Sequence, residues 1–219
     1  MPSEPVREKH FSMIRGFHLA DIFTLGNAAC GVLSLFQVIA HVQAGAAGGG
    51  AGAAGGWHLL AAMALIPFAL ALDILDGRIA RWRRKHSVMG RELDSLADVI
   101  SFGVAPAVIA YGAGMRGLWD ELVLVYFVGC GVSRLARFNV TADELATESG
   151  KVKYFEGTPI PTSIFLVALL AVAAAVGHVG DALWLGAVDL GPGTLHPLVL
   201  SYAVSGSLMI SKTVRIPKL

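Results

Sequence analysis

Residues 73–98 read DILDGRIARWRRKHSVMGRELDSLAD, and this stretch links two apolar segments of the chain. Asp73 and Asp76 are three residues apart, and Asp94 and Asp98 are four residues apart. Side chains at these spacings lie on one face of a helix. The basic segment between the two pairs is short, which predicts two antiparallel neighbouring helices. Their four carboxylates should therefore converge.

The composition indicates that this stretch belongs to a membrane protein. Hydrophobic residues make up 55% of the 219 residues and charged residues only 15%, whereas soluble proteins have about 25% charged residues. A disordered chain is excluded, because it would be less hydrophobic and more highly charged. A small soluble domain has too little interior for so much apolar side chain.

Apolar runs of roughly 20 residues, the length needed to cross a bilayer, predict the membrane-spanning segments. The six runs are 18–42, 57–75, 93–113, 118–138, 159–179 and 195–210. They lack the alternation of barrel strands, and helices satisfy their own backbone groups in lipid. The predicted fold is all-α, an integral membrane protein with six transmembrane helices. The expected domains are an N-terminal segment (1–17), a membrane domain (18–212) and a C-terminal tail (213–219).

The basic residues predict how the helices are oriented. Of the 17 Lys and Arg residues, only Arg116 falls on the side opposite the chain termini. The positive-inside rule then makes both termini cytoplasmic and places the four carboxylates at the same face. We therefore expect a protein of the cytoplasmic (inner) membrane whose functional site opens at the cytoplasmic face.

Four carboxylates in a low-dielectric environment repel one another unless cations neutralise them. Oxygen-only ligands suit Mg²⁺ or Mn²⁺, and two facing pairs suit a two-metal site for phosphoryl transfer. The residues Gly77, Ala80 and Gly90 are small enough to let a ligand approach the helices, and Arg81 suits a phosphate. A solvated acidic loop is the simplest competing interpretation.

A cation or proton transporter is the alternative from another class, because intramembrane carboxylates also mark ion paths. Transporters often repeat their halves and place such carboxylates near the bilayer midplane. All four carboxylates here fall at one membrane edge, and the sequence has no second copy of the motif.

The spacing D-x2-D-G-x2-A-R-x8-G-x3-D-x3-D resembles the motif of the CDP-alcohol phosphotransferases, integral membrane enzymes of phospholipid synthesis. Every fixed position is met, by Asp73, Asp76, Gly77, Ala80, Arg81, Gly90, Asp94 and Asp98. The resemblance implies a homodimer of six-helix subunits that transfers a phosphatidyl or related group from a CDP-linked donor to an alcohol and releases CMP. It also implies that two divalent cations are held by Asp73, Asp76, Asp94 and Asp98. By the same resemblance Asp98 is the catalytic base, and the CDP donor is bound by Gly77, Ala80, Arg81 and Gly90.

Segments outside the motif resemble the phosphatidylserine synthase branch of this family. They are 21–31, 94–107, 133–140 and 155–161. This resemblance implies CDP-diacylglycerol–serine O-phosphatidyltransferase activity, with CDP-diacylglycerol and L-serine as substrates and no nucleic acid partner. Arg134 and Arg137 suit the serine carboxylate, or they anchor their helix at the lipid headgroups. Glycerol 3-phosphate and an inositol compound stay open as alternative acceptors.

Polar side chains elsewhere in the spans have two interpretations. Thr24 and Asn27, one turn apart in the first span, face the CDP donor or form hydrogen bonds between helices. Four histidines near the outer ends of the spans are expected to be interfacial and not ligands: His41, His58, His178 and His196.

Overall fold

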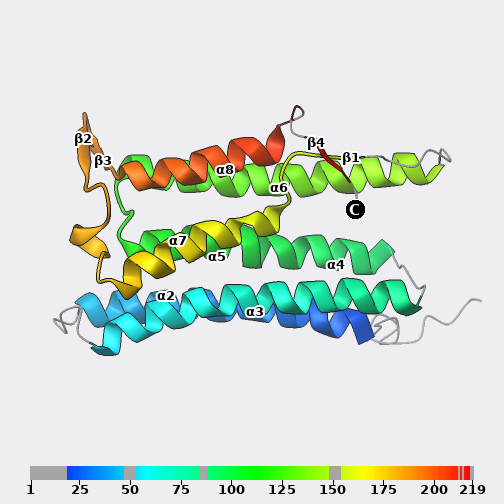
Figure 1. Cartoon of the computed structure of the whole chain (residues 1–219), viewed down its shortest axis with the longest axis horizontal. Coiled ribbons are helices and arrows are strands. Elements are labelled where there is room, and N and C mark those ends of the chain that lie inside the picture. The colour runs from blue at the N-terminus through cyan, green and yellow to red at the C-terminus, as the bar shows by residue number, and fades with distance from the viewer. Residues whose placement is uncertain are drawn as a thin grey trace, which may run out of the picture.

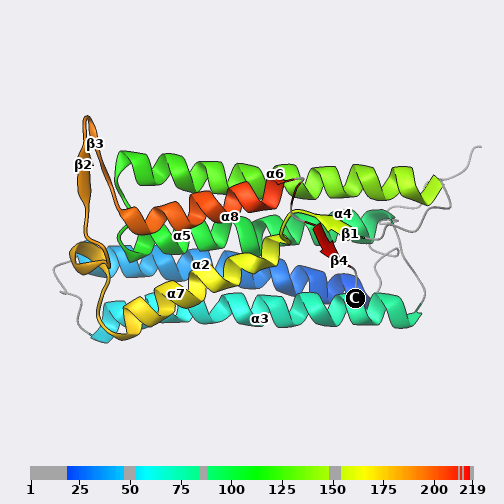
Figure 2. The ribbon, with the colours of Figure 1, turned by 45° about the horizontal axis from the view of Figure 1, so that its top comes forward.

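The structure is a computed structural model that describes residues 19–46, 53–83, 88–147, 154–211, 213 and 215–217. Its helices lie side by side, roughly along one axis (Figures 1 and 2). In chain order these are α2 (Leu19–Ala46), α3 (Ala53–Arg83), α4 (Val88–Asp98), α5 (Ala105–Ala113), α6 (Leu118–Thr147), α7 (Ile164–Ala175) and α8 (Leu200–Ile210). The described chain is thus mostly helical, as predicted.

Four helical stretches are long and apolar enough to cross a membrane, and they match the first four predicted spans. Their bounds are Asp21–Ala46, Gly56–Ile79, Met89–Ala113 and Leu118–Val140. The last two predicted spans are also helical and apolar but shorter, at Ile160–Ala175 and Pro197–Ile210. Each begins with a turn of 3₁₀-helix that has proline in its first turn, at Ile160–Ser163 and Pro197–Val199. The predicted N-terminal segment lies outside the described residues, and the orientation of the termini stays a prediction.

The third span is not a uniform α-helix. α4 ends at Asp98, and Val99–Val104 form a stretch of π-helix before α5 begins at Ala105. Such π-turns inside helices are frequent at functional sites. Ser101, Phe102 and Gly103 in this turn are buried, so Asp98 adjoins an irregularity packed inside the bundle.

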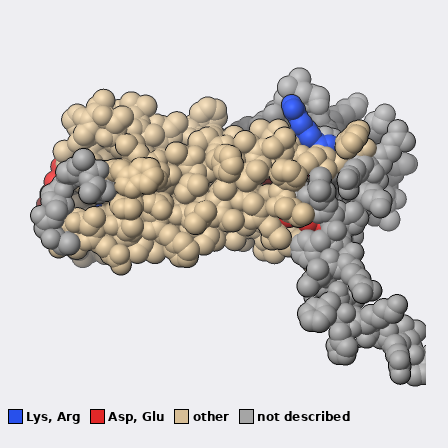
Figure 3. Space-filling view, turned by 90° about the horizontal axis from the view of Figure 1, so that it is seen from below, with Lys and Arg blue, Asp and Glu red and all other residues tan. Residues whose placement is uncertain are grey.

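The outside of the bundle is apolar along most of its length. Large side chains more than half exposed include Phe36, Phe68, Val125 and Phe165. Figure 3 shows one face on which uncharged residues cover the long middle and charged residues appear only toward the ends. The interior is packed by Phe102, Ile109, Phe127 and Tyr202, among others. Helices that are apolar all round are typical of a membrane protein.

Two short antiparallel sheets accompany the helices and were not predicted. β1 (Tyr154–Glu156) pairs with β4 (Arg215–Pro217), and β2 (Val188–Leu190) pairs with β3 (Gly193–Leu195). The β2–β3 hairpin lies across one end of the bundle (Figure 1), and Gly191 in its turn has a φ of 58°. β4 lies within the predicted C-terminal tail, so this part of the tail is tied to the segment that follows α6.

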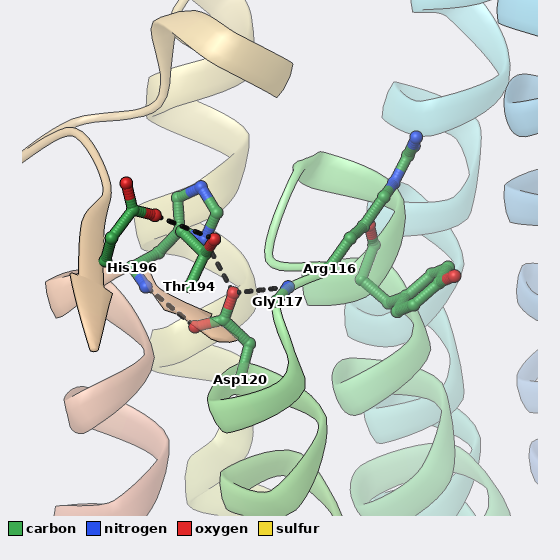
Figure 4. Close-up of polar contacts among 7 residues, drawn as sticks. Arg116, Gly117, Asp120, Thr194 and His196 are labelled. Carbon is green, nitrogen blue, oxygen red and sulfur yellow. Dashed lines mark hydrogen bonds and ion pairs between the residues drawn. The ribbon is translucent and has the colours of Figure 1, made fainter. Parts of the chain in front are cut away.

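Asp120 at the start of α6 joins this end of the bundle to the hairpin. Its buried carboxylate accepts hydrogen bonds from the backbone N–H of Gly117 (2.9 Å) and of His196 (2.8 Å). It also lies 2.6 Å from Nδ1 of His196 (Figure 4). His196, predicted to be interfacial, therefore has a buried carboxylate as its partner.

Candidate active site

Helices α3 and α4 bring the four predicted carboxylates together. Asp73 and Asp76 lie in the second half of α3, and Asp94 and Asp98 lie toward the end of α4. Carboxylate oxygens of Asp73, Asp76 and Asp94, one from each, lie within 4.8 Å of one another. Asp98 adjoins this group, because it is close enough to Asp73 and Asp94 for their charges to interact. The helical spacing and the side-by-side packing of the helices together create the cluster.

The surroundings of the cluster fit a divalent cation. Asp76 and Asp98 are buried, and Oδ1 of Asp94 is buried without a hydrogen-bond partner among the described residues. A buried polar atom left without a partner is costly, and a bound cation would satisfy it. Three carboxylates within reach of one ion form the all-oxygen ligand set of Mg²⁺ or Mn²⁺.

Helix α2 contacts the carboxylates through the two polar residues predicted for it. Thr24 Oγ1 donates a hydrogen bond to Asp76 Oδ2 at 2.8 Å. Asn27 Nδ2 donates to Asp98 Oδ1 at 3.3 Å. Thr24 and Asn27 thus make interhelical hydrogen bonds, one of the two interpretations of the sequence, and their partners are the site carboxylates themselves.

A close approach of α2 to the π-helical turn sets this geometry. Ser101 Oγ donates a hydrogen bond to the backbone carbonyl of Asn27 at 2.8 Å. A Cβ atom placed on Gly31, one turn further along α2, would lie 2.7 Å from Ser101 Oγ and 3.0 Å from Ser101 Cα. Only glycine therefore lets the two backbones approach this closely.

The small motif residues lie beside the carboxylates on the same two helices. Gly77 follows Asp76 directly on α3, and Gly90 precedes Asp94 by four residues on α4; both are partly buried. Ala80 and Arg81 lie further along α3, and their side chains fall outside the part that the structure describes.

The two arginines predicted to bind the acceptor have different surroundings. Arg134 is partly buried on α6, lies close enough to Asp98 for their charges to interact, and stacks 5.7 Å from the ring centroid of Phe138. Arg137 directs both terminal nitrogens at the backbone carbonyl of Ile210 on α8, at 3.4 Å each. Of these two arginines, Arg134 is therefore the one whose charge interacts with a site carboxylate.

A further polar cluster, which the sequence analysis missed, joins α4 to α6. Ser95 Oγ donates a hydrogen bond to Asn139 Oδ1 at 3.3 Å, and Asn139 Nδ2 donates to Glu92 Oε2 at 3.1 Å. Ser95 lies one turn before Asp98. The sequence feature that could have indicated this cluster is Asn139, a polar amide in the last turns of an apolar span that also contains Arg134. The cluster holds the helix of the candidate base against the helix of the candidate acceptor-binding arginine.

Comparison with known proteins identifies the family. A family model described as CDP-alcohol phosphatidyltransferase matches residues 17–193, well over half of the chain. The chain belongs to this family of transferases, which confirms the resemblance found in the motif.

Several curated relatives that the chain resembles are named CDP-diacylglycerol–serine O-phosphatidyltransferase. The Saccharomyces cerevisiae relative is 41% identical over 214 residues, which cover 96% of this chain and 74% of the relative. The Bacillus subtilis relative is 31% identical over 156 residues, 70% of this chain and 75% of the relative. The Mycobacterium tuberculosis relative is 43% identical over 122 residues, which cover 54% of this chain and only 42% of the relative.

Proposed function

We propose that this protein transfers a phosphatidyl group from CDP-diacylglycerol to L-serine, with release of CMP. The observation that carries the proposal is that carboxylate oxygens of Asp73, Asp76 and Asp94 lie within 4.8 Å of one another, with Asp98 close enough for its charge to interact with theirs. The names of the relatives from yeast and from Bacillus support serine as the acceptor.

The cluster Asp73, Asp76, Asp94 and Asp98 would hold two divalent cations, Mg²⁺ or Mn²⁺. When bound, these ions neutralise the donor's pyrophosphate and the charge that develops on the CMP leaving group. Thr24 orients Asp76 through their 2.8 Å hydrogen bond. Such hydrogen bonds to ligating carboxylates tune metal affinity.

The CDP donor binds where α3 and α4 present small residues next to these carboxylates. Gly77 and Gly90 leave room for the nucleotide, and Ala80 and Arg81 occupy the next motif positions on α3. Asn27 borders the same space and acts through Asp98, which receives its hydrogen bond.

Asp98 accepts the proton of the serine hydroxyl as the hydroxyl oxygen attacks the phosphorus that bears diacylglycerol. A hydroxyl group is a weak nucleophile until a positioned base removes its proton. The hydrogen bond from Asn27 fixes one oxygen of Asp98, which holds the carboxylate in a single orientation for this step.

Arg134 binds the carboxylate of serine. Its position near Asp98 places a planar, permanently charged guanidinium beside the base, and Phe138 supports it from one side. Arg137, the other arginine assigned to the acceptor, is directed toward Ile210, so its surroundings support this role less.

In the membrane, we place this site at the cytoplasmic face of the inner membrane, with six helices crossing and both termini cytoplasmic. The distribution of Lys and Arg supports this orientation. α7 and α8 run along the same axis as the long helices (Figure 1), which supports counting them as crossings although they are short. A homodimer follows from the resemblance to the family.

The test measures CMP release by purified protein in detergent with CDP-diacylglycerol, Mg²⁺ or Mn²⁺, and a panel of alcohols. We expect release with serine and not with glycerol 3-phosphate or inositol compounds. Asp98→Asn should abolish turnover while CDP-diacylglycerol still binds. Asp181→Asn, which changes an exposed carboxylate, is the matched control.

The outcomes separate this proposal from its alternatives. Release with glycerol 3-phosphate or an inositol compound alone would keep the enzyme class and overturn serine as the acceptor. No release with any alcohol, together with cation flux in proteoliposomes that Asp98→Asn abolishes, would favour a transporter.

A further inference from the structure

A cavity of about 560 Å³ lies between α6 and α8, away from the four carboxylates of the proposed reaction. Its lining residues are Tyr126, Gly129, Cys130, Ser133, Arg137 and Ile210. This volume is within the range of about 300–1,000 Å³ that ligand sites occupy. None of the four site carboxylates lines the cavity, and its α6 residues all lie within the apolar span Leu118–Val140.

Arg137 is the charged group of this cavity, and its guanidinium is weakly engaged. Both terminal nitrogens share one acceptor, the Ile210 carbonyl, at the long distance of 3.4 Å. A guanidinium has five N–H donors. Among the described residues, no carboxylate forms an ion pair with Arg137. A cation in an apolar span favours an anionic partner near the membrane surface.

The rest of the cavity wall suits a hydrocarbon chain. Gly129 is exposed, and a Cβ atom built on it would meet nothing within 4 Å. Cys130 forms a buried part of the wall. Tyr126, two turns of helix before Ser133, is fixed across to α8 by a 3.0 Å contact between its hydroxyl and Ser207 Oγ. The wall therefore has a polar, cationic end at Ser133 and Arg137 and an apolar stretch that leads away from it.

We propose that this cavity binds one phospholipid molecule of the surrounding bilayer, separate from the CDP-diacylglycerol substrate. The lipid phosphate contacts the guanidinium of Arg137 and the hydroxyl of Ser133, and one acyl chain lies along Gly129 and Cys130 toward Tyr126. Lipids with a net negative headgroup are favoured over zwitterionic lipids, because Arg137 is the only charged residue among the described residues that line the cavity.

Native mass spectrometry of the purified full-length protein tests this proposal. Saturating CDP occupies the nucleotide site, and the protein is mixed with equal amounts of phosphatidylglycerol and phosphatidylcholine that have the same acyl chains. We expect one tightly retained lipid, with phosphatidylglycerol preferred by about fivefold, the effect of roughly one interfacial charge.

Two variants change the lipid binding in different ways. Arg137→Gln should abolish the preference for phosphatidylglycerol and leave phosphatidylcholine binding unchanged. Gly129→Leu should weaken binding of both lipids, because the new side chain enters the cavity without displacing a neighbour. Arg116→Gln, which removes an exposed arginine outside the cavity lining, should behave as the unchanged protein.

Three results would overturn the proposal. They are an unchanged headgroup preference in Arg137→Gln, unchanged lipid binding in Gly129→Leu, and loss of the retained lipid when CDP is added. Equal thermal unfolding midpoints of the variants and the unchanged protein show that each difference arises in the cavity and not from unfolding.

Discussion

Asn27 donates a hydrogen bond through its side-chain amide to Asp98 at 3.3 Å, although the two residues are 71 positions apart in the sequence. The side-chain Oδ1 atom of Asn27 is buried without a hydrogen-bond partner among the described residues. The backbone carbonyl of Asn27 accepts a hydrogen bond from the hydroxyl of Ser101, which lies three residues after Asp98. α2 therefore positions the candidate base although it contributes none of the four carboxylates.

Asn27→Ala should lower kcat for CMP release by about tenfold or more, because a hydrogen bond to a charged group contributes about 1.5–3 kcal/mol. The measurement is turnover at saturating CDP-diacylglycerol and serine. Ser34→Ala is the control, since Ser34 is also buried on α2 but bonds the Ala62 carbonyl, away from the carboxylates. An equal loss of kcat in both variants would mean that Asn27 has a packing role alone.

Thr24→Val should weaken metal binding, because it removes the hydroxyl that orients Asp76. We expect the concentration of Mn²⁺ at half-saturation to rise by about tenfold, the usual effect of losing a hydrogen bond to a metal ligand. Mn²⁺ titration followed by electron paramagnetic resonance measures this without turnover. Thr24→Ser keeps the hydroxyl and should retain the affinity. Equal affinities in the Thr24→Val variant and the unchanged protein would contradict the role.

Arg134→Gln should raise KM for serine by about tenfold, because it removes a charge-assisted contact to the substrate carboxylate. KM for CDP-diacylglycerol should stay the same. Initial rates at varied serine and fixed donor concentration provide the test, and Arg116→Gln is the charge-matched control. A rise in KM for the donor alone would assign Arg134 to the nucleotide and not to the acceptor.

Gly31→Ala should destabilise the bundle where α2 meets the π-helical turn. The new Cβ atom would lie 2.7 Å from Ser101 Oγ and 3.0 Å from Ser101 Cα, and overpacking of this kind costs about 1–3 kcal/mol. Thermal unfolding in detergent should show a lower midpoint. Gly45→Ala, on the same helix with open space around it, should unfold as the unchanged protein does.

Asp120→Ala should lower the thermal unfolding midpoint and leave turnover by the folded protein unchanged. The substitution leaves the N–H groups of Gly117 and His196 without their acceptor, which costs about 1–3 kcal/mol for each group that stays buried. Asp189→Ala is the control, because Asp189 is exposed and accepts a hydrogen bond from Thr194 at the surface. Equal unfolding midpoints for the two variants would show that Asp120 does not contribute to stability.

The helices could be predicted because their signals are local. Apolar run length located the four long spans to within a few residues at most ends, and the shorter α7 and α8 also coincide with predicted runs. The strands could not be predicted in the same way. β1 and β4 are each three residues long and about 60 positions apart in the sequence. Their pairing therefore depends on where the end of α8 places β4, and not on the composition of the two strands.

The sequence by itself determined that Asp73, Asp76, Asp94 and Asp98 would share one region, because helical periodicity and a short connection require it. Tertiary structure alone decided which groups surround them. It placed Thr24 and Asn27 against the carboxylates and gave His196 a buried partner in Asp120. It also placed Arg134 within the reach of the Asp98 charge and directed Arg137 toward α8. Periodicity and hydropathy act along one helix, whereas these contacts depend on how helices distant in sequence pack and rotate against one another.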